Sequence, residues 1–373
     1  MSIPLRMRIA LELERLRRNN LKVLHPLHQL FWESTLRCNV SCRHCGSDCR
    51  STSTTPDMPA EDFLRVLDNI KPHVNSHEVM IIISGGEPLM RADLADVGRE
   101  IYIREFPWGM VTNGLALTPS KLKELYFAGL HSLTISLDGL EEDHNWLRCH
   151  PMSFKRASAA IKMMSQQEDI IGEHPLQAPI VWDVVTCVNQ RNIGKLNEIR
   201  DYLISLGAPA WRLFAIAPMG RAKDNEEMIL TNEQHKYLLD FIKESRTDTR
   251  KSGDLDISYC CESFLGSYEG YVRGHLYQCA AGISVASVLI DGSISGCTSV
   301  RGKYYQGNIY NDDFWEVWNK RFDVFRNRKW ARELEPCKNC DMFRYCEGNG
   351  MHLREEDGSL MACTYKKINS ITL

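Results

Sequence analysis

The stretch that decides the fold is Leu30-Phe-Trp-Glu-Ser-Thr-Leu36, an apolar run typical of a buried strand, followed by Arg37-Cys38-Asn-Val-Ser-Cys42-Arg-His-Cys45. Three cysteines stand in one short loop, separated by three residues and then by two. A zinc site usually has four ligands in paired C-x-x-C knuckles. Three thiolates in one tight loop instead suit an iron–sulfur cubane in which one iron has no protein ligand and can bind a substrate.

Outward from this loop, short apolar runs alternate with amphipathic segments. Strands are expected at Leu30–Leu36, Val79–Ile83, Gly109–Thr112, Ser132–Ser136, Ile180–Cys187 and Trp211–Ile216. Helices are expected between them, for example at Ala60–Ile70, Pro119–Ala128, Ser153–Met164 and Ile193–Leu206. This alternation predicts an α/β fold with a parallel sheet and its ligand site at the carboxyl ends of the strands. Six strand–helix units predict a partial (β/α)6 barrel, an incomplete version of the TIM-like barrel.

The chain divides into four expected parts. Residues 1–29 are expected to form an amphipathic helix, because Leu5, Ile9, Leu13 and Leu16 recur at helical spacing. We expect it to cap the core, with docking on a membrane surface or a partner as the alternative. The barrel is expected over residues 30–230, a connecting helix and linker over 231–258, and a cysteine-rich domain over 259–373. In that last domain Asp291-Gly292 predicts a hairpin turn and Asp313–Arg328 a helix.

The composition argues against several classes of function. The formal net charge is −3, which gives no electrostatic reason to expect nucleic-acid binding. No apolar run approaches the roughly 20 residues of a transmembrane helix, and charges interrupt the N-terminal segment where a secretory signal would be continuous. We therefore expect a cytoplasmic protein. Disulfides are rare there, so 14 cysteines, most of them clustered, indicate metal binding or redox chemistry.

The loop Cys38–Cys45 resembles the defining motif of the radical S-adenosylmethionine (SAM) superfamily, in which three cysteines follow the first barrel strand and an aromatic-type residue, here His44, precedes the last. The resemblance implies a [4Fe–4S] cluster on Cys38, Cys42 and Cys45, with the amino and carboxylate groups of SAM on the fourth iron. A zinc site is the alternative. Cys49 follows closely, but three thiolates already complete the set, so we expect it not to be a ligand.

Other segments agree with this resemblance. Ser84-Gly85-Gly86-Glu87-Pro88 ends the second strand; glycines permit close approach to the backbone, and the carboxylate of Glu87 can pair with the SAM ammonium group. Ser136-Leu-Asp138-Gly139 ends the fourth strand, where related enzymes bind the SAM ribose, although a capped turn is the alternative. Asn189, past the fifth strand, is expected to contact the SAM carboxylate or to form a turn.

The second cysteine-rich region resembles the SPASM domain, which carries auxiliary iron–sulfur clusters. Six of that domain's seven cysteines are present, at Cys279, Cys297, Cys337, Cys340, Cys346 and Cys363. The resemblance implies a distal cluster on the last four, with a zinc ribbon as the alternative. The proximal cluster would use Cys279, Cys297 and either Cys260 or Cys261, because Gly350 stands where a further ligand is expected. One or two auxiliary clusters are therefore expected, and a proximal cluster would have an open iron.

The combined resemblance implies an oxidoreductase that reductively cleaves SAM to a 5′-deoxyadenosyl radical, which abstracts hydrogen from a substrate. We expect the substrate to be a peptide or protein side chain; a small molecule such as a tetrapyrrole precursor is the alternative, and a pure electron carrier is a third reading. Thr298 stands where sulfatase-maturing members have a catalytic aspartate, which argues against that reaction. The catalytic acid or base is not identifiable.

Partners follow from the same resemblance. About 30 residues precede the first strand, too few for a peptide-recognition domain, so a peptide substrate is expected to dock directly or through a separate recognition protein. The segments Phe31–Cys49 and Tyr345–Leu353 are similar to a subgroup from anaerobic bacteria that is paired with small lipoproteins. An electron donor of the flavodoxin or ferredoxin type is also expected.

Overall fold

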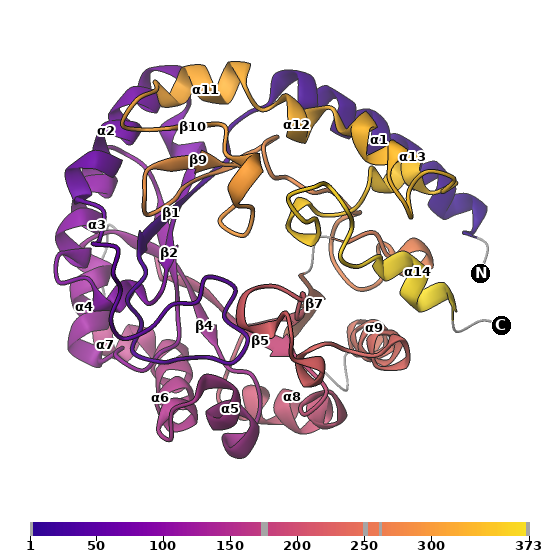
Figure 1. The fold of residues 1–373 in the computed structure, drawn as a ribbon. Helices are drawn as coiled ribbons and strands as arrows, with labels where there is room; N and C mark the ends of the chain where they lie inside the picture. The colour runs from indigo at the N-terminus through magenta and orange to yellow at the C-terminus, as the bar shows by residue number, and fades with distance from the viewer. Residues whose placement is uncertain (1–2, 173–177, 249–252, 261–262, 371–373) are drawn as a thin grey trace.

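The computed structural model describes residues 3–172, 178–248, 253–260 and 263–370. Its core is one curved sheet with helices on its outer face (Figure 1). Seven strands run parallel in chain order, namely β1 Gln29–Thr35, β2 Met80–Gly85, β3 Trp108–Thr112, β4 Leu130–Ser136, β5 Val181–Val188, β6 Ala210–Ala215 and β7 Asp256–Tyr259. The six predicted barrel strands are confirmed to within about two residues at their ends.

The C-terminal region extends the same sheet rather than forming a separate one. Strand β8 (Val285–Val288) pairs in parallel with β1, and β9 (Ser293–Ser295) and β10 (Gly307–Asn308) continue antiparallel from it. The hairpin predicted at Asp291-Gly292 is confirmed by the β8–β9 pairing. Strand β8 of the cysteine-rich segment therefore lies beside β1, the strand that leads into the first cysteine loop.

The helices cover the outer face of the sheet and bury one apolar side each. Helix α2 shows the pattern: Phe63, Leu67 and Ile70 are fully buried, and Glu61 and Asp62 occupy its first turn. The other barrel helices are α3 Leu94–Ile103, α4 Pro119–Phe127, α5 Glu141–Arg148, α6 Ser153–Ser165, α7 Gln167–Ile171 and α8 Leu196–Ser205, with α2 at Ala60–Ile70. Helix α9 (Asn232–Thr247) begins at a capping box formed by Thr231 and Gln234.

Two sequence predictions about helices need correction. The helix predicted over Asp313–Arg328 is broken into α11 (Phe314–Lys320) and α12 (Asp323–Arg326), where Trp318, Phe322 and Phe325 all turn into the core. The N-terminal helix α1 (Leu5–Leu24) forms, but it does not bury the predicted apolar residues: Leu5, Ile9, Leu13 and Leu16 are 53–75% exposed.

Short helices complete the C-terminal region, α13 at Phe343–Cys346 and α14 at Thr364–Asn369. Helix α13 lies against α1, since Arg18 of α1 donates to the Tyr345 carbonyl (2.6 Å) (Figure 1). Within the described residues, the helices lack the combination of length and apolar character that crossing a bilayer requires.

Candidate functional site

The first cysteine loop closes a pocket at the carboxyl ends of the strands. Cys38, Cys42 and Cys49 are 4–8% exposed and pack together, and Cys45 lies against them. They line a cavity of about 150 Å³ that the ends of β2, β3 and β4 complete. Its other lining residues are Val40, His44, Gly85, Gly86, Glu87, Val111, Thr112, Asn113, Ser136, Arg148 and Arg221. Segments far apart in sequence thus meet at one edge of the sheet.

The thiols of this pocket differ in their ionisation. Burial raises the pKa of the Cys38 thiol to about 12. Hydrogen bonds from Cys49, whose backbone N–H lies 3.4 Å from the Cys45 sulfur, lower the pKa of the Cys45 thiol. Binding of a metal cluster to these thiols would therefore release protons.

The paired glycines are required by the chain itself. Gly85 has a positive φ of 128°, and a Cβ there would collide with the carbonyl oxygen of Thr35. A Cβ on Gly86 would collide in the same way with the carbonyl oxygen of Arg37. The glycines thus let the end of β2 pack directly on the residues that lead into the cysteine loop.

Glu87 is almost fully buried, at 1% exposure. Its Oε1 accepts from the Thr112 hydroxyl (2.7 Å) and the Leu89 N–H (3.2 Å), and its Oε2 accepts from the Asn113 N–H (2.8 Å). Burial raises the pKa of this carboxyl group, and the three hydrogen bonds oppose that effect. The carboxylate therefore ties the ends of β2 and β3 together at the pocket wall.

Asp138 is joined to the cysteine loop through an arginine that the sequence analysis did not single out. Its Oδ1 accepts from the Cys187 N–H (2.8 Å), and its Oδ2 accepts from Arg148 Nε (2.5 Å). Arg148 Nη1 in turn lies 3.7 Å from the Cys42 sulfur. Burial opposes ionisation of Asp138, but the charge of Arg148, its hydrogen bond and further neighbouring charges together outweigh burial and lower the pKa to about 2. Asp138 is therefore a buried anion whose charge Arg148 balances.

The residues predicted to bind the SAM ribose and carboxylate lie in different settings. Ser136 lines the cavity beside the thiols. Asn189 is buried in its own loop, where its Oδ1 accepts from the Arg191 N–H (2.9 Å). This is the geometry of a turn, which was the alternative for that residue.

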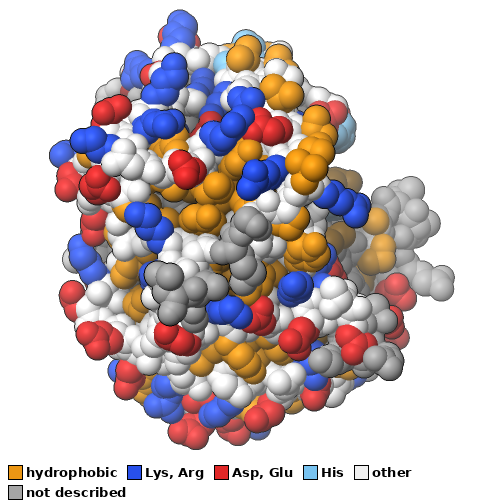
Figure 2. Space-filling model, turned by 90° about the vertical axis from the view of Figure 1, so that its right-hand side faces the viewer, with side chains coloured by type: hydrophobic (Ala, Val, Ile, Leu, Met, Phe, Trp, Pro, Cys, Tyr) orange, Lys and Arg blue, Asp and Glu red, His pale blue; other side chains and the backbone are white. Residues whose placement is uncertain are grey.

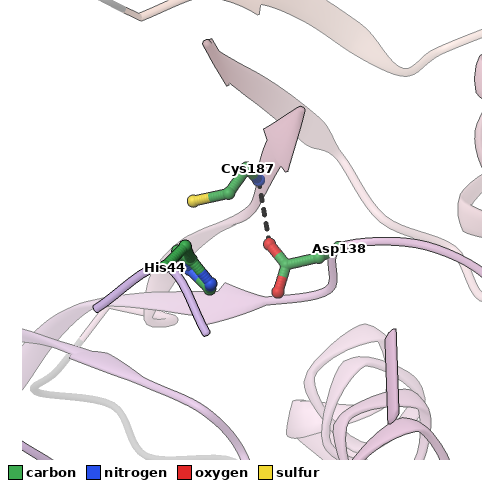
Figure 3. A group of neighbouring side chains, drawn as sticks. All are labelled: His44, Asp138 and Cys187. Atoms are coloured by element: carbon green, nitrogen blue, oxygen red, sulfur yellow. Dashed lines mark hydrogen bonds between the residues drawn. The ribbon is translucent and has the colours of Figure 1, made fainter. Parts of the chain in front are cut away.

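Figure 3 shows the side chains of His44, Asp138 and Cys187 close together beside the pocket. Their ligand atoms all lie within 4.8 Å of one another. A cation here would compete with Arg148 for Asp138, and burial lowers the pKa of His44 to about 4, so the imidazole is neutral. The Nδ1 of His44 is buried, and no partner for it is found among the described residues. This nitrogen can therefore accept a hydrogen bond from a ligand or donate one to it.

The distances between the cysteine sulfurs can be compared with those around a tetrahedral zinc ion. A tetrahedral zinc with Zn–S distances of about 2.3 Å brings its sulfurs to within about 3.8 Å of one another. In the described part of the chain, no three of the clustered cysteines have sulfurs within 4.8 Å of one another. Among the described residues, the cysteine sulfurs are thus spaced more widely than around a bound tetrahedral zinc.

Four C-terminal cysteines lie near one another. Cys337 and Cys346 are 7% and 9% exposed, and Cys340 and Cys363 are partly exposed. Burial, followed by the charges of the other three thiols, raises the pKa of Cys346. Arg354 Nη2 lies 3.6 Å from the Cys337 sulfur. The set has a cationic donor near one sulfur, as the first cysteine loop has in Arg148.

Cys279 and Cys297 form a third group. Burial raises the pKa of the Cys297 thiol, and the charge of Cys279 adds to this effect. The sulfur of Cys260 lies 3.5 Å from Arg212 Nη1, so its side chain faces β6. Cys261 lies outside the described residues.

A further cavity of about 230 Å³ lies between the first cysteine loop and the C-terminal region. Gly46 and Ser47 line one side, and Thr298–Arg301 and Met351–His352 line the other. A ligand there would contact residues next to two of the three cysteine groups.

Comparison with known proteins agrees with this arrangement. The sequence pattern of the radical SAM superfamily matches residues 32–168, and that of an iron–sulfur cluster-binding domain, SPASM, matches residues 279–341. The chain is a radical SAM enzyme with a SPASM domain. The radical SAM domain binds a [4Fe–4S] cluster and SAM, and the SPASM domain binds auxiliary iron–sulfur clusters.

Relatives of this radical SAM enzyme include proteins with different substrates. It is 26% identical to an AdoMet-dependent heme synthase of Methanosarcina barkeri, over 85% of this chain and 89% of that one. It is 28% identical to the mycofactocin maturase MftC of Mycolicibacterium smegmatis, over 86% of this chain and 77% of that one. Its fold matches anSMEcpe with bound AdoMet and Cp18Cys peptide, with a TM-score of 0.69, 20% identity, and coverage of 92% of this chain and 95% of that one.

Proposed function

We propose that this radical SAM enzyme modifies a side chain of a peptide or protein by abstracting a hydrogen atom from it. The observation that carries the proposal is the cavity of about 230 Å³ beside Gly46 and Ser47. It is smaller than the roughly 300–1,000 Å³ usual for sites that enclose a whole small molecule. A single inserted side chain suits it better, with the rest of the substrate outside.

Charge in this cavity favours the same substrate class. Each of its three cationic side chains already has a partner in the chain: Arg301 pairs with Glu33, Lys223 with Glu355 (3.2 Å), and Arg354 donates to the Gly358 carbonyl (2.5 Å). A tetrapyrrole carries several carboxylates and would have to displace these acceptors. A peptide side chain has no such requirement.

The SAM site is assigned to the first pocket. Cys38, Cys42 and Cys45 would hold the cluster, whose reduced form supplies the electron that cleaves SAM to methionine and a 5′-deoxyadenosyl radical. Arg148, buried beside Cys42, is complementary to the SAM carboxylate, and the buried carboxylate of Glu87 to the ammonium group.

The other candidate residues of this site would bind the ribose or support the residues that contact SAM. We assign Ser136 to a hydroxyl of the ribose, since it lines the cavity. Asp138 would act through Arg148, because both of its oxygens already accept hydrogen bonds. Asn189 would shape the loop after β5.

The auxiliary clusters are assigned to the other two cysteine groups. Cys337, Cys340, Cys346 and Cys363 would hold the distal cluster. Cys279 and Cys297 would hold the proximal one, with Cys261 as the third thiolate, since Cys260 faces Arg212 instead. We further propose a flavodoxin or ferredoxin as electron donor and a cytoplasmic location. A separate recognition protein or a small lipoprotein would be the partner.

Modification of a tetrapyrrole is the second candidate, and the similarity to an AdoMet-dependent heme synthase over most of both chains supports it. The reconstituted enzyme would be offered pools of peptides made from deuterated amino acids, and separately Fe-coproporphyrin III deuterated on its side chains. Mass spectrometry of 5′-deoxyadenosine then identifies the source of the abstracted atom. We expect deuterium from the peptides only; transfer from the porphyrin alone would establish the second candidate.

A further inference from the structure

Helix α1 buries two basic side chains and leaves most of its aliphatic side chains exposed. Arg18, 3% exposed, points inward and donates to the carbonyl of Tyr345 (2.6 Å). Lys22 also points inward and pairs with Glu347 (2.5 Å). Leu11 is also buried, at 3% exposure, and Met7 packs against the core, whereas the aliphatic side chains on the opposite face of α1 point into solvent. The helix is thus held by polar contacts together with the packing of Leu11, and a second set of aliphatic side chains remains exposed.

Five exposed aliphatic residues lie in a stripe along one side of α1, with the polar Asn20 between Leu16 and Val23. Leu5, Ile9, Leu13, Leu16 and Val23 fall on one side of the helix at 100° per residue, and they are 75%, 55%, 63%, 53% and 75% exposed. Helix α1 has 20 residues and is therefore about 30 Å long. Single exposed aliphatic residues are ordinary, but several on one helix face indicate an interaction surface.

Cations flank this stripe on both sides. Arg6 and Arg17 lie along one margin, and Arg8 and Arg15 lie along the other. Two acids, Glu12 and Glu14, are bonded to Arg15 (2.9 Å) and Arg17 (2.7 Å). Without Arg18 and Lys22, which point inward, α1 has four Arg and two Glu, a formal charge of +2. Figure 2 faces the side of the molecule where α1 begins, and hydrophobic side chains gather there beside Lys and Arg side chains.

We propose that the apolar stripe of α1 lies on a membrane surface that contains anionic lipids. Aliphatic residues would enter the boundary between headgroups and acyl chains, and the flanking arginines would extend to the lipid phosphates. The composition favours lipid over a protein partner, because protein interfaces draw their binding energy from Trp, Tyr and Arg, whereas Leu and Val are under-represented there.

The charges also disfavour a second copy of the chain as the occupant. An antiparallel pair of α1 helices would bring the Arg6 and Arg17 margin against itself. A parallel pair would bring that margin against Arg8 and Arg15. Either arrangement places cations opposite cations.

The test is co-sedimentation of the full-length, cluster-loaded protein with vesicles of phosphatidylcholine, alone or mixed with phosphatidylglycerol. We expect binding to the mixed vesicles that weakens as salt increases. The combined variant Leu5→Gln, Ile9→Gln, Leu13→Gln, Leu16→Gln should lower the partition coefficient by roughly tenfold or more. It should keep its thermal midpoint and its SAM cleavage, because the four side chains are exposed and glutamine favours helix.

A matched control removes apolar side chains elsewhere. Ile103→Gln with Val181→Gln replaces residues of similar exposure (62% and 64%) on the barrel and should leave vesicle binding unchanged. Arg6→Gln with Arg17→Gln should weaken binding to the mixed vesicles. Absence of wild-type binding would overturn the proposal, as would binding that is insensitive to the combined variant. A wild-type dimer that this variant converts to a monomer would overturn it in favour of a second copy.

Discussion

Arg148, at the end of α5, donates a 2.5 Å hydrogen bond to the buried carboxylate of Asp138, at the end of β4. The same guanidinium lies 3.7 Å from the sulfur of Cys42. One arginine therefore connects the fourth strand to the cysteine loop that follows the first. Because both charges are buried, each depends on the other for its stability.

Asp138→Asn should accordingly destabilise the protein. The substitution leaves Arg148 buried without its counter-charge, at a cost of about 3–5 kcal/mol in the free energy of unfolding. Chemical denaturation of the cluster-loaded protein measures this cost. Asp96→Asn is the matched control, since Asp96 pairs with Arg99 on the surface, and it should change stability by less than about 0.5 kcal/mol. Equal effects of the two variants would mean that the Asp138–Arg148 pair is not a structural unit.

Glu87→Gln should weaken SAM binding by roughly tenfold or more, since a charge-assisted hydrogen bond to the ammonium group contributes about 1.5–3 kcal/mol. It should also lower the thermal midpoint, because a glutamine amide would face one of the N–H or O–H donors that now bond the carboxylate. Equilibrium dialysis on the folded protein separates the two effects. Glu124→Gln, on an exposed i,i+3 pair, is the control and should alter neither quantity. A tighter or unaltered SAM affinity in Glu87→Gln would limit the role of Glu87 to joining the strands.

Cys49→Ser should leave the radical cluster in place. Its backbone N–H, which is the group within 3.4 Å of the Cys45 sulfur, is retained in the variant. Iron analysis and the electron paramagnetic resonance signal of the reduced cluster should match those of the wild type. Loss of about four irons on this substitution would make Cys49 a ligand.

The auxiliary clusters can be counted in the variant that has Cys38, Cys42 and Cys45 replaced by Ala. With both clusters present it should hold about eight irons, and Cys279→Ala should remove about half of them. Cys260→Ala should have no effect on this count, because the Cys260 side chain is turned to Arg212. A total of about four irons, insensitive to Cys279→Ala, would show that the proximal cluster is lost.

Much of the barrel follows from local pattern alone. Strands such as β2 are apolar runs bounded by turn residues, so their positions could be predicted to within about two residues. The pairing of β8 with β1 could not, because Val285–Val288 lie some 250 residues after Gln29–Thr35 and no local signal specifies the pairing.

The orientation of α1 illustrates a second limit. Its spacing predicts an apolar stripe but not which face is buried. That choice depends on Tyr345 and Glu347, which lie more than 300 residues further along the chain. Arg148 was missed for a similar reason, since an arginine at the end of a polar helix usually lies in solvent. Its role depends on Asp138 and Cys42, which the fold brings to it.

The central claim is that three thiolates of one loop hold the cluster that cleaves SAM. The most direct test is the amount of 5′-deoxyadenosine released when the anaerobically reconstituted protein is incubated with SAM and dithionite. We predict release by the wild type even without substrate, and none by the variant in which Cys38, Cys42 and Cys45 are all replaced by Ala, although that variant retains its auxiliary iron. Release of 5′-deoxyadenosine by the triple variant at the wild-type rate would contradict the account.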